Sequence, residues 1–271
     1  MALSEFDLAG KNAVVVGGGR GIGRGIALAL AEAGAQLVVA ARTEREIEET
    51  ALEIGRLGGK ATPFRADATK AEDAEALIAR AVSTWGRLDI LVNSAGVGLR
   101  KPIVPLPGYR PGWASGRKDF DLRTSDDEWR AMIDSNLTCI FLATRAAGPR
   151  MIQQGKGKVI NVTSMTGARG FPNQVIYCTT KAAVSMYTRA LALEWARYNI
   201  NVNAIAPGYV ATPMTRLFFE DEAIKEKLLD SVPLGRLCQP REVGLLAVYL
   251  ASEASDYLTG QTIYLDGGVV A

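Results

Sequence analysis

Tyr177 and Lys181 stand four residues apart, and Ser164 lies thirteen positions before the tyrosine. The chain contains no histidine, so acid–base chemistry near neutral pH would need another proton donor. Side chains at positions i and i+4 share one face of a helix. An ammonium group there favours the phenolate and lowers the pKa of the phenol from about 10. The pair therefore predicts a tyrosine general acid or base; the alternative is a solvated pair on a helix surface.

A glycine-rich turn near the start of the chain forms a second candidate site. Gly17, Gly21 and Gly23 lie between a short apolar run and an alanine-rich segment. Glycine lets the backbone turn tightly and approach a ligand closely, and the start of the following helix directs free N–H groups and a partial positive charge at the bound group. The spacing G-x-x-x-G-x-G differs from G-x-G-x-x-G. Its place directly after a predicted strand nevertheless indicates a dinucleotide pyrophosphate site.

The end of the second predicted strand indicates which dinucleotide is bound. This position would meet the adenosine ribose, where a carboxylate would bind a 2′-hydroxyl and repel a 2′-phosphate. The sequence here is Ala40-Ala41-Arg42, without an acid, and Arg20 in the glycine turn adds a second cation. A guanidinium group suits phosphate oxygens, so we expect NADP(H) rather than NAD(H). The alternative is that both arginines are simply solvated.

Short apolar runs alternate with longer periodic segments along the whole chain. This β–α repeat predicts a single-domain, Rossmann-like α/β fold, a doubly wound parallel sheet of about seven strands with helices on both faces. No linker divides residues 1–271, so one dinucleotide-binding domain is expected. The expected strands are Asn12–Val16, Gln36–Ala41, Ala61–Ala66, Leu88–Asn93, Lys158–Thr163, Ile200–Ile205 and Thr262–Leu265. The expected helices are Ile22–Ala33, Glu44–Leu57, Ala71–Trp85, Asp126–Gln153 and Val175–Tyr198.

Two segments interrupt this alternation. Residues 98–125 are rich in proline, glycine, arginine and tryptophan, and residues 211–231 contain an amphipathic stretch. We expect an inserted loop and a lid-like segment, because long irregular segments in compact domains are usually functional or mobile; a peripheral contact between subunits is the alternative for both. The insert offers two possible walls for a substrate, an apolar one and a cationic one. The apolar set is Trp113, Tyr109, Phe120, Pro105 and Pro107, and the cationic set is Arg100, Lys101, Arg110, Arg117 and Lys118.

The composition excludes several classes of protein. Apolar residues make up 48% and charged residues 22%, as in a globular protein, and a net charge of +2 argues against a phosphate-driven nucleic-acid binder. Three cysteines without a Cys-x-x-Cys pair, in a chain without histidine, predict no metal site. No apolar run is long enough to span a membrane, and the first residues do not resemble a signal peptide. A cytoplasmic location is therefore expected.

Together these features resemble the short-chain dehydrogenase/reductase family over nearly the whole chain. The matching residues are GGGRGIG at 17–23, Asp67, NSAG at 93–96, Asn136, Ser164, YCTTK at 177–181, PGYVATP at 207–213 and DGG at 266–268. Val16 stands where the family often has threonine, and Ser94 replaces the second asparagine of the usual NNAG. The segment between Gly96 and Asn136 is longer than usual by roughly a dozen residues, so analogy does not extend to the substrate pocket.

The resemblance implies a role for each matching residue near the substrate oxygen and the nicotinamide. Tyr177 would exchange a proton with the substrate oxygen, and Ser164 would hydrogen-bond the same oxygen. Lys181 would lower the pKa of the tyrosine and hold the nicotinamide ribose. Asn136 would hold a water molecule that relays protons from Lys181.

The resemblance also implies the contacts of the cofactor. Asp67 would meet the adenine edge, and Val210 and Thr212 would anchor the carboxamide. The full cofactor set is Gly17, Gly19, Arg20, Gly21, Ile22, Gly23, Arg42, Asp67, Ala68, Asn93, Ala95, Gly96, Tyr177, Lys181, Pro207, Gly208, Val210 and Thr212.

The implied activity is an NADP(H)-dependent oxidoreductase that interconverts a secondary alcohol and a ketone. Two alternatives remain open: the same site could act on an imine, an enoyl bond or a dehydration substrate, or the chain could bind NADP(H) without turnover. The expected partners are a small-molecule alcohol or ketone and further copies of the chain in a homotetramer or homodimer, since the family commonly assembles about two-fold axes. No nucleic acid or membrane partner is expected.

Overall fold

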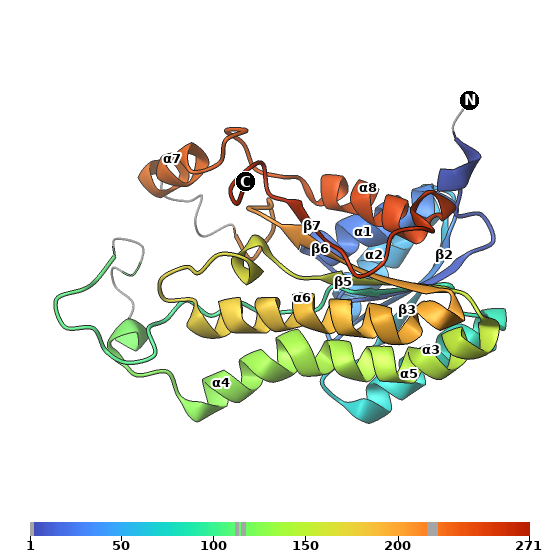
Figure 1. Cartoon of the computed structure of the whole chain (residues 1–271), viewed down its shortest axis with the longest axis horizontal. Coiled ribbons are helices and arrows are strands. Elements are labelled where there is room, and N and C mark those ends of the chain that lie inside the picture. Colours follow the sequence, from blue (N-terminus) through green and yellow to red (C-terminus); the bar gives the residue numbers. More distant parts are fainter. Residues whose placement is uncertain (1–2, 112–113, 115–117, 216–221) are drawn as a thin grey trace.

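The computed structural model describes residues 3–111, 114, 118–215 and 222–271, and its centre is one sheet of seven strands (Figure 1). The strand order is β3-β2-β1-β4-β5-β6-β7, and every neighbouring pair is parallel. The strands are β1 (Asn12–Val16), β2 (Gln36–Ala41), β3 (Lys60–Arg65), β4 (Ile90–Asn93), β5 (Gly157–Val162), β6 (Ile200–Pro207) and β7 (Thr262–Leu265). The predicted doubly wound parallel sheet is confirmed, and each predicted strand is present to within two residues at either end.

The direction in which the chain moves across the sheet reverses between β1 and β4. From β1 the chain proceeds outward to β2 and β3, then returns to pair β4 with the other side of β1. Connections that leave in opposite directions open a crevice at the carboxyl ends of the strands. The strands β1, β4 and β5 are buried along their whole length. Helices on both faces require such continuous apolar runs.

Helices form a layer on each face of the sheet (Figure 1). One layer holds α1 (Gly21–Glu32), α2 (Glu44–Arg56) and α8 (Pro240–Ala251), whose buried side chains share one core with Val15 and Val39. The other holds α3 (Ala71–Trp85), α5 (Cys139–Gln154) and α6 (Val175–Trp195), which share a second core with Val14 and Val38. Alternate residues of the same strands thus face opposite layers, as the two-residue period of a strand requires.

The helix α8 is absent from the sequence-based expectations. It packs against α1 so closely that a Cβ atom at Gly25 would lie 2.5 Å from the carbonyl oxygen of Pro240, and one at Gly244 would lie 2.6 Å from that of Gly25. Two local signals mark its start: Pro240 stands in the first turn, and Gln239 and Glu242 form a capping box. This helix fixes the position of α1, and therefore of the glycine turn before it.

The predicted helical span Asp126–Gln153 is confirmed, but it is not α-helical throughout. It begins as α4 (Asp126–Ile133), which is capped by Ser125, and passes through one π-helical turn at Asp134–Thr138 before continuing as α5. A π turn inserts one extra residue into the helical ladder and occurs frequently at functional sites. The predicted span Val175–Tyr198 is α6 followed by a 3₁₀ turn at Ala196–Tyr198.

The two interrupting segments lie at the same end of the molecule (Figure 1). In the insert, Thr124 donates from its N–H to the carbonyl oxygen of Ile103 (3.0 Å) and from its hydroxyl to that of Pro102 (2.8 Å), so the ends of the loop meet. The second segment contains α7 (Glu222–Asp230), and residues 216–221 of it fall outside the described ranges.

Within the described ranges, no helix combines the length and apolar character needed to cross a bilayer. In the same residues, no group of three or more histidine, cysteine, aspartate or glutamate side chains could hold a metal ion.

Candidate active site

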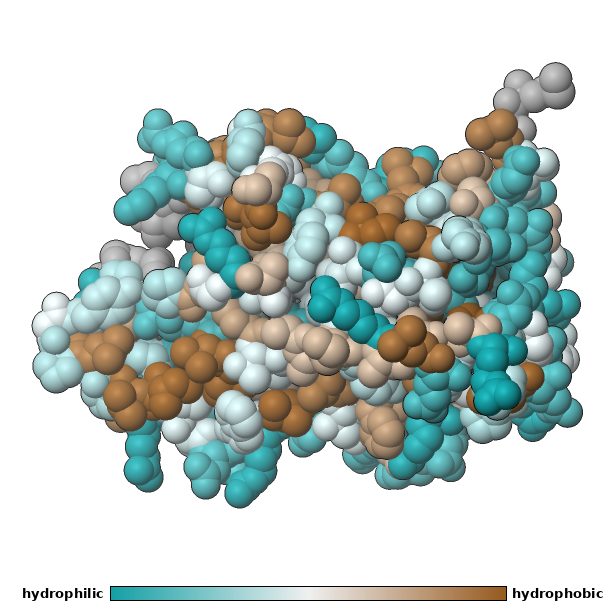
Figure 2. Space-filling model, viewed as in Figure 1, coloured by the Kyte–Doolittle hydropathy of each residue, from teal (hydrophilic) through white to brown (hydrophobic). Residues whose placement is uncertain are grey.

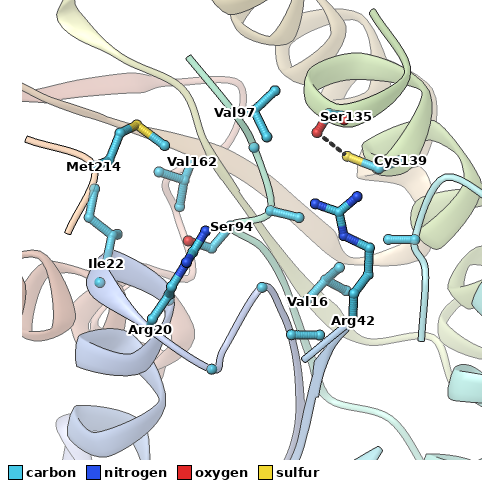
Figure 3. Close-up of a pocket in the computed structure, with 18 of the residues that line it drawn as sticks. Val16, Arg20, Ile22, Arg42, Ser94, Val97, Ser135, Cys139, Val162 and Met214 are labelled. Carbon is cyan, nitrogen blue, oxygen red and sulfur yellow. Dashed lines mark hydrogen bonds between the residues drawn. The ribbon is translucent and has the colours of Figure 1, made fainter. Parts of the chain in front are cut away.

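A cavity of about 440 Å³ lies at the carboxyl ends of the central strands (Figure 3). Its wall combines the glycine turn, the ends of β1, β2, β4 and β5, and the first turns of α6. Both its volume and its place at the switch point of a parallel sheet are those of a cofactor site. The predicted residues that line it are Gly17, Gly19, Arg20, Gly21, Ile22, Gly23, Arg42, Asp67, Ala68, Ala95, Gly96, Tyr177, Lys181 and Thr212.

The glycine turn leaves no room for side chains at two of its positions. Gly17 has a φ of +81°, and a Cβ atom there would lie 2.6 Å from the main-chain nitrogen of Ala95. A Cβ atom at Gly23 would lie 2.1 Å from the carbonyl oxygen of Gly17. The helix α1 begins at Gly21, and Arg20 at its N-cap position makes no side-chain cap hydrogen bond. The turn is therefore a bare backbone cradle that leads into a helix start, as an anion site requires.

Two cations stand at this part of the cavity, as predicted. Arg20 and Arg42 both line it, and their side chains extend into the space above the glycine turn (Figure 3). Arg20 is not alone: its Nη1 lies 3.4 Å from Oε1 of Glu46, which comes from α2 and also lines the cavity. The carboxylate that the strand end lacks is thus supplied by the next helix.

Asp67, which follows β3, lies in the wall of the same cavity. Its Oδ1 accepts hydrogen bonds from the N–H (3.1 Å) and the hydroxyl (2.8 Å) of Thr69. Partial burial raises the pKa of this carboxyl, but the Thr69 hydrogen bonds and the charges of Arg42 and Lys70 outweigh burial and hold the pKa below its usual value. Asp67 is therefore an anionic acceptor at the cavity.

Tyr177 and Ser164 are the two residues predicted to contact the substrate oxygen. Tyr177 lies in the first turn of α6, is half-buried and lines the cavity. Ser164 follows β5 and is buried, and its Oγ accepts a hydrogen bond from the N–H of Thr166 at 3.2 Å. Burial raises the pKa of Tyr177 above 10, and a hydrogen bond with Ser164 partly offsets this rise. The phenol is therefore protonated at neutral pH.

Lys181 lies one turn further along α6 and is buried. Its Nζ donates to the carbonyl oxygen of Val162 at 3.0 Å and lies 5.8 Å from the centre of the Tyr177 ring. Burial lowers the pKa of Lys181 to about 8. The sequence predicted that this ammonium lowers the pKa of Tyr177. The net shift of the Tyr177 pKa is instead upward, because burial is its largest cause.

Asn136 occupies the π turn between α4 and α5 and is fully buried. Its Oδ1 accepts from the N–H of Val97 (2.7 Å), and its Nδ2 donates to the carbonyl oxygen of Val97 (3.0 Å) and to Oγ1 of Thr180 (3.3 Å). The Thr180 hydroxyl in turn donates to the carbonyl oxygen of Tyr177 at 2.9 Å. Asn136 therefore links the chain after β4 to the helix that carries Tyr177, rather than lining the cavity.

Four residues expected to contact the cofactor do not line this cavity. Asn93 is buried, and its Nδ2 donates to Oδ1 of Asn161 at 2.9 Å, which ties β4 to β5. Val210 is buried in the core of the α1 layer. Pro207 ends β6, and a Cβ atom at Gly208 would lie 2.7 Å from Cα of Asp266. A motif gives the position of a residue but not the direction of its side chain.

In the part of the chain that the structure describes, the insert contributes little to this cavity. Beyond Gly98, none of its described residues lines the cavity. Phe120 is buried inside the insert itself, beside the ring of Tyr109 at 6.5 Å and beneath the guanidinium of Arg110 at 5.7 Å. Pro105 and Pro107 are exposed in it. Trp113 and Arg117 lie outside the described residues.

The cationic alternative is also corrected at Lys101. This side chain is 4% exposed, and its Nζ lies 2.9 Å from both carboxylate oxygens of Glu128. Its main-chain N–H donates to the carbonyl oxygen of Asn173 at 2.7 Å. Lys101 therefore attaches the base of the insert to α4 and to the loop before α6, and does not face a substrate.

Several wall residues were not expected from the sequence. Glu46, Cys139 and Met214 all line the cavity. Met214 lies near Gly98, where a Cβ atom would be 3.8 Å from its Sδ, and Cys139 donates from Sγ to the carbonyl oxygen of Ser135 at 3.0 Å (Figure 3). Glu46 had one local signal, its place in the acidic first turn of α2. No sequence pattern marked Cys139 or Met214.

Comparison with known proteins supports the interpretation of this site. A profile of the family described as "Enoyl-(Acyl carrier protein) reductase" matches residues 16–270. The chain is 39% identical to the 2-dehydro-3-deoxy-D-gluconate 5-dehydrogenase of Escherichia coli strain K12, over all of both proteins. A gluconate 5-dehydrogenase from Burkholderia cenocepacia, crystallised with NADP and tartrate, matches with a TM-score of 0.86 at 36% identity, over 99% of this chain and 98% of that one. A short-chain type dehydrogenase/reductase from Mycobacterium marinum matches over the whole of both chains with a TM-score of 0.87 at 36% identity. This chain therefore belongs to the short-chain dehydrogenase/reductase family and is an oxidoreductase enzyme.

Proposed function

We propose that this enzyme interconverts a secondary alcohol and a ketone with NADP(H), and that Tyr177 is its general acid and base. One observation carries the proposal: Tyr177 and Lys181 line the same cavity as the glycine cradle. A proton donor and a dinucleotide site within one cavity are the two parts that a carbonyl reductase needs.

The residues present fit a nicotinamide dinucleotide. The cradle of Gly17 and Gly23 admits a close backbone approach that any Cβ atom would prevent. The Oγ of Ser94 is buried in the cavity wall without a hydrogen-bond partner in the described part of the chain, which leaves a polar atom for a ligand to satisfy. Gly17, Gly21 and Gly23 would hold the pyrophosphate, and Thr212 would face the nicotinamide portion. The cofactor supplies or accepts the hydride.

The protein's own contribution is to hold and move one proton. In reduction, the Tyr177 phenol gives its proton to the substrate oxygen, and in oxidation the phenolate accepts it. The Ser164 hydroxyl donates to that oxygen as negative charge develops. Because Tyr177 is protonated at neutral pH, the resting enzyme is prepared for reduction without a prior proton uptake.

Lys181 and Asn136 support this transfer. The pKa of about 8 means that the Lys181 ammonium can release and regain a proton near the working pH. We propose that Lys181 also binds the nicotinamide ribose and that Asn136 contributes to proton supply from the solvent. The hydrogen bonds from Asn136 to Thr180 and from Thr180 to the carbonyl oxygen of Tyr177 hold Asn136 in a fixed position relative to the first turn of α6.

The preference for NADP(H) is proposed from Arg20 and Arg42, the two cations at the cavity. A planar guanidinium suits the oxygens of a 2′-phosphate. Comparison of kcat/KM for NADPH and NADH tests this preference, and a larger value for NADH would contradict it.

Because two similar proteins are named for gluconate chemistry, hydroxylated carboxylates and their ketones are the first compounds to screen. A second candidate activity, reduction of an enoyl bond, is favoured by the description of the matching family profile. Analysis of products from a panel of ketones and enoyl compounds separates the two.

The test of the proposed chemistry is Tyr177→Phe. The variant should retain cofactor binding, measured by nucleotide fluorescence, and lose roughly 10²- to 10⁴-fold in kcat. Tyr198→Phe, an exposed tyrosine that follows α6, is the matched control and should retain activity. Full turnover by Tyr177→Phe would refute the assigned role, whereas cofactor binding without turnover in the unaltered protein would favour a binding protein.

We also propose a homotetramer. Phe141 of α5 and Met186 and Leu193 of α6 keep exposed apolar side chains. Apolar patches are visible on the face of the molecule where these helices lie (Figure 2). Helix surfaces of this kind commonly pack against a second copy of the chain. Light scattering coupled to size-exclusion chromatography measures the mass directly. The expected cytoplasmic location stays a prediction.

A further inference from the structure

We propose that Glu46 limits how strongly this enzyme distinguishes NADP(H) from NAD(H), because its carboxylate occupies Arg20, the cation that a 2′-phosphate would otherwise take. This inference rests on the proposed function, since it concerns the same dinucleotide site. It assigns a specificity role to a residue on α2 that lies outside the sequence motifs of the site.

The ion pair stands at the cavity itself. The distance between Nη1 of Arg20 and Oε1 of Glu46 is 3.4 Å, and both residues line the cavity. The side chain of Arg20 is 68% exposed and that of Glu46 is 29% exposed, so the pair is accessible to a ligand that arrives from the solvent. A pair of this length and exposure is weak enough to be exchanged for another anion.

The backbone of Glu46 is held against the glycine turn. A Cβ atom at Gly19 would lie 2.9 Å from Cβ of Glu46, so the helix backbone lies directly against the turn. Thr50, one turn further along α2, donates to the carbonyl oxygens of Gly19 (3.2 Å) and Glu46 (2.9 Å). Ile47 is buried in the core beside them. The backbone of Glu46 is therefore fixed beside the turn, and its carboxylate stays within side-chain reach of Arg20.

The local charges balance in the absence of a ligand. Arg20 and Arg42 bring two positive charges to this part of the cavity, and Glu46 and Asp67 bring two negative ones. A 2′-phosphate would add further negative charge beside Glu46, whereas a 2′-hydroxyl would find a carboxylate acceptor there. The arginines favour NADP(H), and Glu46 opposes that preference. The ratio of the affinities for NADP(H) and NAD(H) should therefore be smaller than the arginines alone would produce.

The experiment compares Glu46→Gln with the unaltered protein in two readouts. Calorimetry on the protein without cofactor gives the affinities for 2′,5′-ADP and 5′-AMP, which differ only in the 2′-phosphate. Steady-state kinetics gives the ratio of kcat/KM for NADPH and NADH. Removing one partly exposed charge should raise both ratios in favour of the phosphorylated ligand by roughly fivefold.

A matched control separates this effect from a general change of surface charge. Glu49 lies on the same helix, does not line the cavity and pairs with Arg45 at 2.7 Å. Glu49→Gln removes the same charge and the same kind of ion pair, and should change both ratios by less than about twofold. Thermal unfolding of each variant confirms that the fold is retained.

The Arg20→Met variant tests whether Glu46 acts on cofactor preference through Arg20. If Glu46 acts by occupying Arg20, Glu46→Gln should produce a clearly smaller change in both ratios when Arg20 is already replaced. The inference is overturned if Glu46→Gln leaves both ratios unchanged, or if its effect is equally large in the Arg20→Met background. The absolute ratio of the unaltered enzyme tests the proposed NADP(H) preference separately, so either proposal can fail without the other.

Discussion

The ammonium group of Lys181 donates to the main-chain carbonyl of Val162 at 3.0 Å, and this bond directs it toward the end of β5. The Tyr177 ring lies on its other side, with the ring centre 5.8 Å away. Val162 and Lys181 both line the cavity, so the bond lies where the cofactor would bind. The lysine is therefore held in the wall by the sheet, and its buried charge affects both stability and catalysis.

The first prediction concerns the pH dependence of stability. The folded-state pKa of Lys181 is about 8, below its unfolded value of about 10.5. Between these values the unfolded chain binds more protons, so the stability contributed at this site rises as pH increases, while below about pH 8 the folded protein carries the cost of a buried ammonium. Relative to Lys181→Met, the unaltered protein should gain about 2 kcal/mol of unfolding free energy between pH 7.5 and 9.5.

Urea unfolding of both proteins at the two pH values measures this difference, because other groups titrate alike in both and cancel. Lys60→Met, at an exposed position of the edge strand β3, is the control and should show a constant difference from the unaltered protein. A difference that is also constant for Lys181→Met would show that the lysine is not desolvated as the structure indicates.

The second prediction concerns Thr180, whose buried hydroxyl joins Nδ2 of Asn136 (3.3 Å) to the carbonyl oxygen of Tyr177 (2.9 Å). Thr180→Val keeps the shape but removes both hydrogen bonds, so the helix turn that carries the phenol loses a positional restraint. We expect kcat to fall roughly tenfold with the cofactor Kd unchanged. Thr180→Ser should restore kcat.

The neighbouring Thr179→Val is the control for this experiment. Thr179 is exposed and its hydroxyl donates only to Val175 of its own helix, so the variant should retain its kcat. An unchanged kcat for Thr180→Val, or a failure of Thr180→Ser to recover activity, would exclude the positioning role.

The third prediction concerns the glycine cradle. Gly23→Ala would place Cβ at 2.1 Å from the carbonyl oxygen of Gly17, so the turn must open. We expect loss of cofactor binding by at least roughly tenfold, measured by nucleotide fluorescence, because the backbone approach is lost. Gly55→Ala in α2, where nothing lies within 4 Å, should instead stabilise the protein by about 0.5–1 kcal/mol. Equal effects of the two substitutions would contradict this account.

The sequence predicted the sheet well because a buried parallel strand has a strong pattern. Asn12–Val16 is apolar after its first residue, and the structure buries all five positions. The segment Pro240–Ala251 has equally good start signals, but its apolar residues follow a long irregular stretch, and its role became visible only through its contact with Gly25. Local pattern thus identified most elements, and packing identified the remaining helix.

The site was predicted less completely, for two physical reasons. The motifs gave positions along the chain, but Asn93 of β4 is buried against Asn161 of β5, and Val210 packs into the core of the α1 layer. Glu46 was missed because it reaches the cavity from a different element than the strand end. The direction of the Tyr177 pKa shift was also wrong, because spacing along a helix does not reveal burial.

The last prediction concerns the attachment of the insert. The Lys101 side chain is 4% exposed, and Glu128, its partner, is 32% exposed. Glu128→Gln would leave a buried ammonium without its counter-ion and should destabilise the protein by roughly 1–3 kcal/mol. Lys101→Met leaves only a partly exposed carboxylate without its partner, so it should cost less. The double variant should cost less than the sum of the two. Chemical denaturation of the three variants measures this, and a larger loss for Lys101→Met than for Glu128→Gln would contradict the assigned burial.

Because hydrogen bonds from the Ser125 main chain and from Lys101 lower the pKa of Glu128, the stability contributed by this pair should be present above pH 4.5 and decline as pH falls below it.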